Sequence, residues 1–202
     1  MKPFYTISLV AVLAATNVSA GSTLSTNITV EDLTITGLGS VASAYTTSLQ
    51  YTNIMDNDLA LMGGFSYSTG DVLGVSLTGT SLSGGLGYAI SNDFDIDTGV
   101  GSDLVVGALF SNTNFDVGNI DESSSDTQLG ITGQTAIGKG FAFNYSASAP
   151  FDDFGNTISY NFGVAFDTGL GEMKVGMVGG SSKVNSVEIS TTGWTLGFIS
   201  RF

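Results

Sequence analysis

The sequence predicts an all-β protein: a closed, antiparallel, up-and-down transmembrane β-barrel. Three observations support this fold class. The N-terminus has the pattern of an export signal, hairpin-like segments recur along the chain, and the last strand, 194–202, alternates large apolar residues with small or polar ones and ends on Phe202. A barrel strand with lipid on one side and a lumen on the other needs this two-residue period, because successive side chains point to opposite faces.

The first 20 residues are interpreted as a signal peptide that is cleaved after Ala20. Lys2 supplies the positive charge, residues 7–15 supply an apolar core, and residues 18–20 resemble a cleavage site. The apolar core is shorter than the ~20 residues that a transmembrane helix needs; an uncleaved anchor is the alternative. Residues 21–202 then form one domain. No later stretch is apolar enough for a helix, so this domain can span a membrane only as a closed barrel.

The composition excludes several classes of function. Without Cys the exported chain has no disulfide framework, and without His it lacks the base that activates most nucleophiles. Loss of Lys2 with the signal leaves four basic residues against 18 acidic ones, a net charge of −14. A basic surface for nucleic acid is therefore excluded. We expect no cofactor and no enzymatic activity, although a Ser–Lys pair brought together by folding stays open.

The strands are predicted from an opening strand at 28–38 to the closing strand at 194–202. Between them, four segments share one pattern: an alternating strand, a short break with Gly, Asn or Asp, and a second alternating strand. Such breaks are typical of hairpin turns. We expect them on the periplasmic side, where barrel turns are short. The four segments are 49–61, 86–96, 131–143 and 164–175.

The longer polar stretches between these segments are expected to be extracellular loops, at 68–81, 116–126, 149–156 and 181–188. Four periplasmic turns join eight strands, and the C-terminal strand is the ninth. An even number requires the opening strand as well, so ten strands are favoured. Eight strands are the alternative, in which everything before Asp58 is a plug or a periplasmic segment.

Alternation also assigns the two faces of each strand. Along 141–145 and 158–166 the aromatic and aliphatic side chains are expected to face outward, and the Asn, Ser, Gly and Ala residues between them to face inward. The opening strand is less regular, because its apolar residues change parity after Val30. An aromatic girdle near the periplasmic edge is predicted from Phe94, Phe141, Phe166 and Phe202. A soluble β-sandwich is the alternative explanation of one apolar face.

The C-terminal strand resembles that of the small Gram-negative outer-membrane β-barrels, such as the OmpX/Ail type and the OmpA transmembrane domain. In that family the strand is an assembly signal, with Phe last and apolar residues at alternate positions before it. Ser200 departs from this pattern. The resemblance implies an outer-membrane location, contact with lipid and lipopolysaccharide, and recognition by the barrel-assembly machinery. The matching residues are Trp194, Leu196, Phe198 and Phe202.

Two acidic segments are candidates for cation sites. The segment 93–99 has Asp at alternate positions, but an EF-hand-like loop needs Gly at its sixth position and Glu at its twelfth, and Thr98 and Leu104 stand there. A barrel strand is the favoured interpretation of this segment. Asp121, Glu122 and Asp126 are a better place for weakly held divalent cations, with a plain solvated loop as the alternative. No metal site is otherwise expected.

A cluster of charged residues is predicted inside the lumen near the periplasmic edge. Parity points these side chains inward on neighbouring strands, and buried charges are tolerated when they are paired. The hypothesis is a salt-bridged cluster that closes or narrows the inner mouth; separate hydration of each charge is the alternative. The cluster consists of Asp95, Asp97, Asp167, Lys174 and Arg201.

Two classes of function follow from this fold. In the first, a largely closed barrel has a structural or adhesive role and acts through its extracellular loops, because the interior of a small barrel is mostly filled by side chains. In the second, the barrel is a small porin-like passive channel with an acidic lumen that favours cations, because the inward positions carry mostly small polar residues. The first class is preferred.

Overall fold

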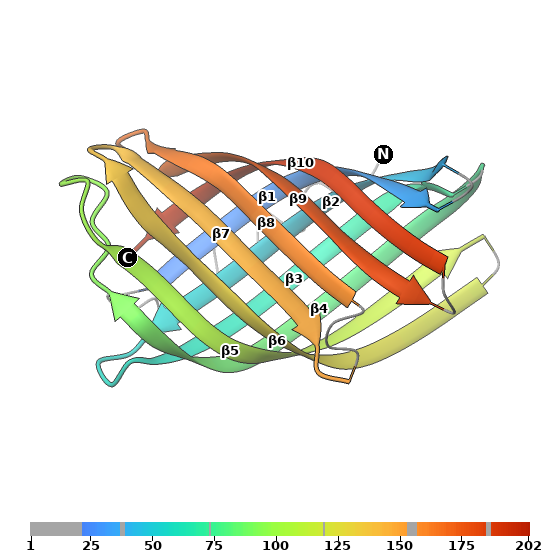
Figure 1. Cartoon of the computed structure of the whole chain (residues 1–202), viewed down its shortest axis with the longest axis horizontal. Helices are drawn as coiled ribbons and strands as arrows, with labels where there is room; N and C mark the ends of the chain where they lie inside the picture. The colour runs from blue at the N-terminus through green and yellow to red at the C-terminus, as the bar shows by residue number, and fades with distance from the viewer. Residues whose placement is uncertain (1–21, 37–38, 73, 119, 153–156, 185–186) are drawn as a thin grey trace.

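The computed structural model describes residues 22–36, 39–72, 74–118, 120–152, 157–184 and 187–202. These residues form ten antiparallel strands (Figure 1). The predicted signal peptide and its cleavage site at Ala20 lie outside the described residues. Nowhere in the described ranges is there a helix long and apolar enough to cross a membrane. The strands are β1 (Ser22–Ile35), β2 (Gly39–Ile54), β3 (Leu59–Val72), β4 (Val75–Asn92), β5 (Ser102–Val117), β6 (Ile120–Gly138), β7 (Phe141–Pro150), β8 (Thr157–Asp167), β9 (Glu172–Val184) and β10 (Val187–Arg201).

The sheet closes between the first strand and the last. Each strand pairs with its neighbours in sequence, and β1 pairs with both β2 and β10, which completes the barrel. Beyond this seam, the backbones of Ser22 and Phe202 exchange hydrogen bonds of 3.3 and 3.0 Å. The closed ten-stranded barrel confirms the predicted fold class. The eight-stranded alternative is wrong, because the residues before Asp58 supply β1 and β2 rather than a plug.

The barrel has a terminal end, where β1 begins and β10 ends, and an opposite far end. All four predicted hairpin breaks lie at the terminal end, where the strands are joined by 55–58, 93–101, 139–140 and 168–171. One of them differs in extent, because residues 94–96 belong to a connection rather than to a strand. The carboxylate of Asp95 accepts hydrogen bonds from the backbone N–H groups of Asp97 (2.9 Å) and Thr98 (3.2 Å), and Gly99 has a positive φ of 75°. These features favour a turn over an extended ladder.

At the far end, most residues of the predicted extracellular loops 68–81, 116–126 and 181–188 belong to strands, which corrects the sequence-based expectation. Of the predicted loop 149–156, residues 149–150 end β7, residues 151–152 lie outside the strands as expected, and 153–156 lie outside the described residues. The strands are joined there only by residues 36–38, 73–74, 118–119, 151–156 and 185–186. The antiparallel ladders continue through Ser- and Thr-rich stretches, as in the pairing of Thr69 with Thr78 and Thr113 with Ser124. They extend close to the connections, as in the pairs Val72–Val75 and Asp116–Asp121. Polarity therefore marks where strands leave the apolar zone, and not where the ladder stops.

Side-chain alternation runs through the whole barrel. On β7 and β8, Phe143, Tyr160 and Phe162 face outward and are exposed, whereas Asn144 is buried on the inner face. The predicted faces of these strands are thus confirmed. The change in parity of the apolar residues along β1 also has an explanation. The ladder between β1 and β10 shows no register shift as far as the pair Ile35–Ile189, so the apolar residues at odd positions near the far end face inward.

The outer wall changes character along each strand. Near the terminal end and the middle it carries exposed apolar side chains, such as Leu86 on β4 and Val175 on β9. Toward the far end the outward positions become polar, as in Asn114 and Asp116 on β5. An apolar band followed by a polar collar is the surface expected of strands that cross a bilayer and then project into water.

Candidate functional site in the barrel lumen

Two adjoining chambers in the lumen are lined by described residues. The larger has a volume of about 370 Å³. The smaller, about 110 Å³, lies nearer the terminal end and borders Lys174, Asp103 and Asn144. The two chambers share wall residues from β2, β6, β7 and β8. Inward side chains that line the larger chamber are mostly small and polar, among them Ser48, Ser66, Ser83, Ser111, Thr132, Ser146, Ser148 and Asn161.

A polar network centred on Arg201 lies inside the terminal end. Its guanidinium forms an ion pair with Asp103 (Nη1 to Oδ2, 3.6 Å) and a second with Glu172. It also donates a hydrogen bond to the side-chain oxygen of Gln134. These partners come from β5, β9 and β6, so one side chain from β10 connects widely separated parts of the wall. We call these four residues the Arg201 network.

The carboxylate of Asp103 is fully engaged. Gln134 donates a hydrogen bond from Nε2 to its Oδ2 (2.9 Å), and the backbone N–H of Phe94 donates to its Oδ1 (3.3 Å). The Phe94 ring lies under the guanidinium of Arg201, with 4.5 Å between Cζ and the ring centroid. The prediction that Phe94 belongs to the outward-facing aromatic girdle near the periplasmic edge is therefore wrong. The connection 93–101 brings this ring to the mouth of the lumen, where it makes a cation–π contact.

Because the Arg201 network is partly buried, removal of one of its members is expected to destabilise the barrel. The side chain of Glu172 is only 3% exposed, whereas those of Asp103 and Arg201 are 20% and 28% exposed. A buried carboxylate is tolerated because it is paired, and removal of its partner would leave an uncompensated charge. The network thus ties four strands together at one end of the lumen.

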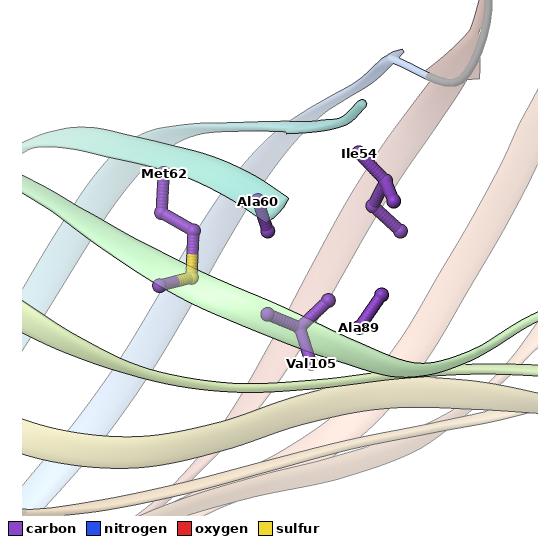
Figure 2. Packing of buried hydrophobic residues seen from close by; sticks show 5 residues of the cluster. All are labelled: Ile54, Ala60, Met62, Ala89 and Val105. Atoms are coloured by element: carbon purple, nitrogen blue, oxygen red, sulfur yellow. The ribbon is translucent and has the colours of Figure 1, made fainter. Parts of the chain in front are cut away.

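An apolar cluster lies beside the network at the same end. Figure 2 shows its five side chains, which project from neighbouring strands β2 to β5 toward one another inside the barrel. All are at most 9% exposed, and Leu109 packs against them. Together with the Arg201 network, this cluster occupies part of the lumen near the terminal end, beside the smaller chamber. Its members are Ile54, Ala60, Met62, Ala89 and Val105.

The predicted charge cluster differs from the arrangement in the structure. Arg201 and Lys174 lie on the inner face, but the other three residues are exposed. Asp167 accepts a hydrogen bond from the backbone N–H of Gly169 (2.8 Å) in its own turn. Asp95 and Asp97 lie in the connection 93–101 and not on a strand.

The residues that pair with Arg201 were missed, although the sequence carried a signal for them. Asp103 has the same parity as the inward Val105, and Glu172 lies two residues before Lys174 on the same strand. Parity alone could have placed both carboxylates in the lumen, but not beside one another.

The acidic segment near the far end is part of β6. Asp126 accepts hydrogen bonds from the Ser111 hydroxyl and from Gln128 (3.1 Å). Across the described ranges, no group of three or more acidic side chains is arranged to hold a metal ion. Weak binding of divalent cations near Asp121, Glu122 and Asp126 stays a prediction.

The C-terminal strand presents its apolar residues to the outside. Trp194, Leu196, Phe198 and Phe202 all face outward and are exposed. Phe141 and Phe166, which the sequence placed in the girdle, are directly paired across β7 and β8 near the terminal end. The orientation suits an assembly signal that is read from the lipid side, and that role stays a prediction.

No protein-family model and no curated protein matches this chain. Among solved structures, it is similar to neisserial surface protein A, with a TM-score of 0.50 and 13% identity over 91% of this chain and 98% of that one. Ail of Yersinia pestis superposes with a TM-score of 0.39 and 15% identity over 90% and 100%. The translocator domain of NalP from Neisseria meningitidis gives 0.44 and 11% over 96% and 93%. At these identities the likeness concerns the fold alone, which is that of outer-membrane β-barrels.

Proposed function

We propose that this protein is a largely closed outer-membrane barrel with a structural or adhesive role, and that it acts through the polar collar at its far end. The observation that carries the proposal is the Arg201 network, which lies beside an apolar cluster at the terminal end. A lumen narrowed by these side chains leaves no wide path for solutes. Export by the predicted signal peptide and contact with lipid, lipopolysaccharide and the assembly machinery belong to the same proposal.

The surface of the far end supports a role in contacts. The hairpins there continue as ordered strands, and β4 and β6 are 18 and 19 residues long, more than the ~9–11 that a bilayer requires. Their outward positions beyond the apolar band are exposed and polar, for example Asn114, Ser123 and Ser125. A rigid projecting collar can present a surface to a partner without long loops.

The residue inventory favours a non-catalytic role. The sequence has neither His nor Cys, and the described lumen walls carry mainly hydroxyl and amide side chains. A hydroxyl needs a neighbouring base to act as a nucleophile. We therefore infer that the lumen does not catalyse a reaction.

A small passive channel that favours cations is the second candidate. The larger chamber has hydroxyl-rich walls, and three buried polar atoms facing the lumen lack a protein partner: Asn144 Nδ2, Asn161 Oδ1 and Glu172 Oε2. Buried polar groups are normally satisfied, so these atoms favour water inside the barrel. A hydrated lumen with excess acid would admit small cations if the terminal end opened.

Planar-bilayer recording of the refolded mature protein separates the two candidates. We expect a boiling-dependent mobility shift on a denaturing gel, which marks a folded barrel, together with a bilayer that shows no discrete conductance steps. The variant Arg201→Ser/Glu172→Ser, which removes the guanidinium and its most buried carboxylate partner, should conduct. The matched control is Lys139→Ser in an exposed turn.

Discrete steps from the wild-type protein, with cation preference in a salt gradient, would overturn the closed-barrel proposal and establish the channel. Silence from both the wild type and the double variant would show that the Arg201 network is not what closes the lumen. Absence of a mobility shift, with the protein soluble without detergent, would contradict the membrane barrel itself.

A further inference from the structure

Lys174 is a buried cation that the Arg201 network does not use. It lies on the inner face of β9 and is 9% exposed. Its neighbours across the two ladders are Ala165 and Gly197, which are too small to cover it. The side chain therefore borders the smaller chamber. The ion pairs of the described residues all involve Arg201, so none of them neutralises Lys174.

The wall around Lys174 holds two buried amide groups, each with one atom that lacks a hydrogen-bond partner. Asn144 is 7% exposed, borders the same chamber, and its Nδ2 has no acceptor. Asn161 also borders the chamber, and its side-chain oxygen has no donor. The oxygen and nitrogen of an Asn amide are assigned from hydrogen bonding, so with no bond to fix it Asn161 can turn its NH₂ group toward the chamber. The ammonium of Lys174 and the amide groups of Asn144 and Asn161 then line the same chamber.

The carboxylates nearby are held by a different cation. Asp103 also borders the chamber, but both its oxygens accept hydrogen bonds and it pairs with Arg201. Glu172 precedes Lys174 by two residues and has one free oxygen, yet its ion pair is with Arg201. An ammonium without an ion-pair partner is stabilised by an anion at contact distance. The chamber thus offers a site for a mobile counter-ion.

We propose that the smaller chamber binds a small monovalent anion of halide or short carboxylate size, held by Lys174, Asn144 and Asn161. The volume of about 110 Å³ is several times the ~10–15 Å³ that a cavity needs to hold one water, so there is room for such an ion and one or two waters. The ion reaches the site through the larger chamber, which shares wall residues such as Thr132 and Ser146. The site does not depend on whether the barrel conducts.

Bromide is the probe, because it is halide-sized and visible by anomalous scattering. The mature protein is refolded in detergent and unfolded with urea in sodium bromide or in sodium gluconate at equal ionic strength, and Trp194 emission is recorded. At equal ionic strength the two salts screen charges alike. Gluconate is too large for the chamber, so the two conditions differ in whether the chamber can be occupied. With a Kd of ~20 mM, bromide at ~0.2 M raises the folding equilibrium constant by about tenfold. The same gain is expected for Lys139→Met, whose lysine lies in an exposed turn, and no gain for Lys174→Met.

An equal gain in Lys174→Met and in the wild type would overturn the anion site, because bromide would then act elsewhere. If Lys174→Met fails to fold, Asn144→Ser provides the second variant, with a gain reduced at least threefold. Crystals of the wild type soaked in bromide give an independent result: an anomalous peak between Lys174 and Asn144 supports the site, and an empty chamber refutes it. Conductance is measured separately, so a channel result would refute the closed barrel and leave this site untouched.

Discussion

Substitution of Arg201 by Met is the most direct test of how the terminal end is held. The change keeps a long side chain but removes the positive charge shared by Asp103 and Glu172. Breaking a buried ion pair destabilises a protein by ~3–5 kcal/mol, whereas an exposed pair is worth ~0–1 kcal/mol. Glu172 is almost fully buried, while Asp103 and Arg201 are 20% and 28% exposed. We therefore expect a loss of about 3 kcal/mol, at the lower edge of the buried range.

Urea unfolding of the refolded barrel, followed by the emission of Trp194, the single tryptophan of the chain, measures this loss. The double variant Arg201→Met/Glu172→Gln should recover part of it, because the stranded carboxylate is replaced by a neutral amide. Lys139→Met serves as the control for loss of an exposed charge. A loss below about 0.5 kcal/mol for Arg201→Met, or a double variant whose loss equals the sum of the two single ones, would refute the coupling inferred from the structure.

Three further outcomes are expected. Gly163→Ala should destabilise the barrel by about 1–3 kcal/mol in the same assay, because its Cβ would lie 2.5 Å from a carbonyl oxygen on β9, whereas Gly84→Ala, with nothing within 4 Å, should be neutral. Trp194, 64% exposed on the outer wall, should be quenched by lipids brominated on their acyl chains; no quenching would contradict its lipid-facing position. The hydroxyl and backbone N–H of Thr98 lower the pKa of Asp95 below its ordinary value of 3.8, so the connection 93–101 should be most protease-resistant above that value and loosen as the pH falls through the lowered pKa. Asp95→Asn should show no such pH dependence.

The barrel itself was accessible from the sequence because its signals are local. Alternation with a period of two is a property of consecutive residues, so the outward aromatic residues of β7 and β8 and the four terminal-end turns could be read directly. The strand count followed from those turns. Loop positions at the far end could not be read in the same way, because Ser and Thr are as compatible with a water-exposed ladder as with a loop, and the pairing of Asp116 with Asp121 decides the matter.

The contents of the lumen depended on the closed structure. Parity determined that Arg201 and Lys174 face inward, but the partners across the barrel depend on register, strand tilt and closure, which are not properties of any one segment. Asp103 is 98 positions from Arg201 along the chain, and Phe94 reaches the same guanidinium only because residues 93–101 leave the ladder. The sequence by itself therefore determined the wall of this protein and the direction of most side chains on its strands. Only the tertiary structure decided which charges meet inside the barrel, because that depends on how ten strands close on one another.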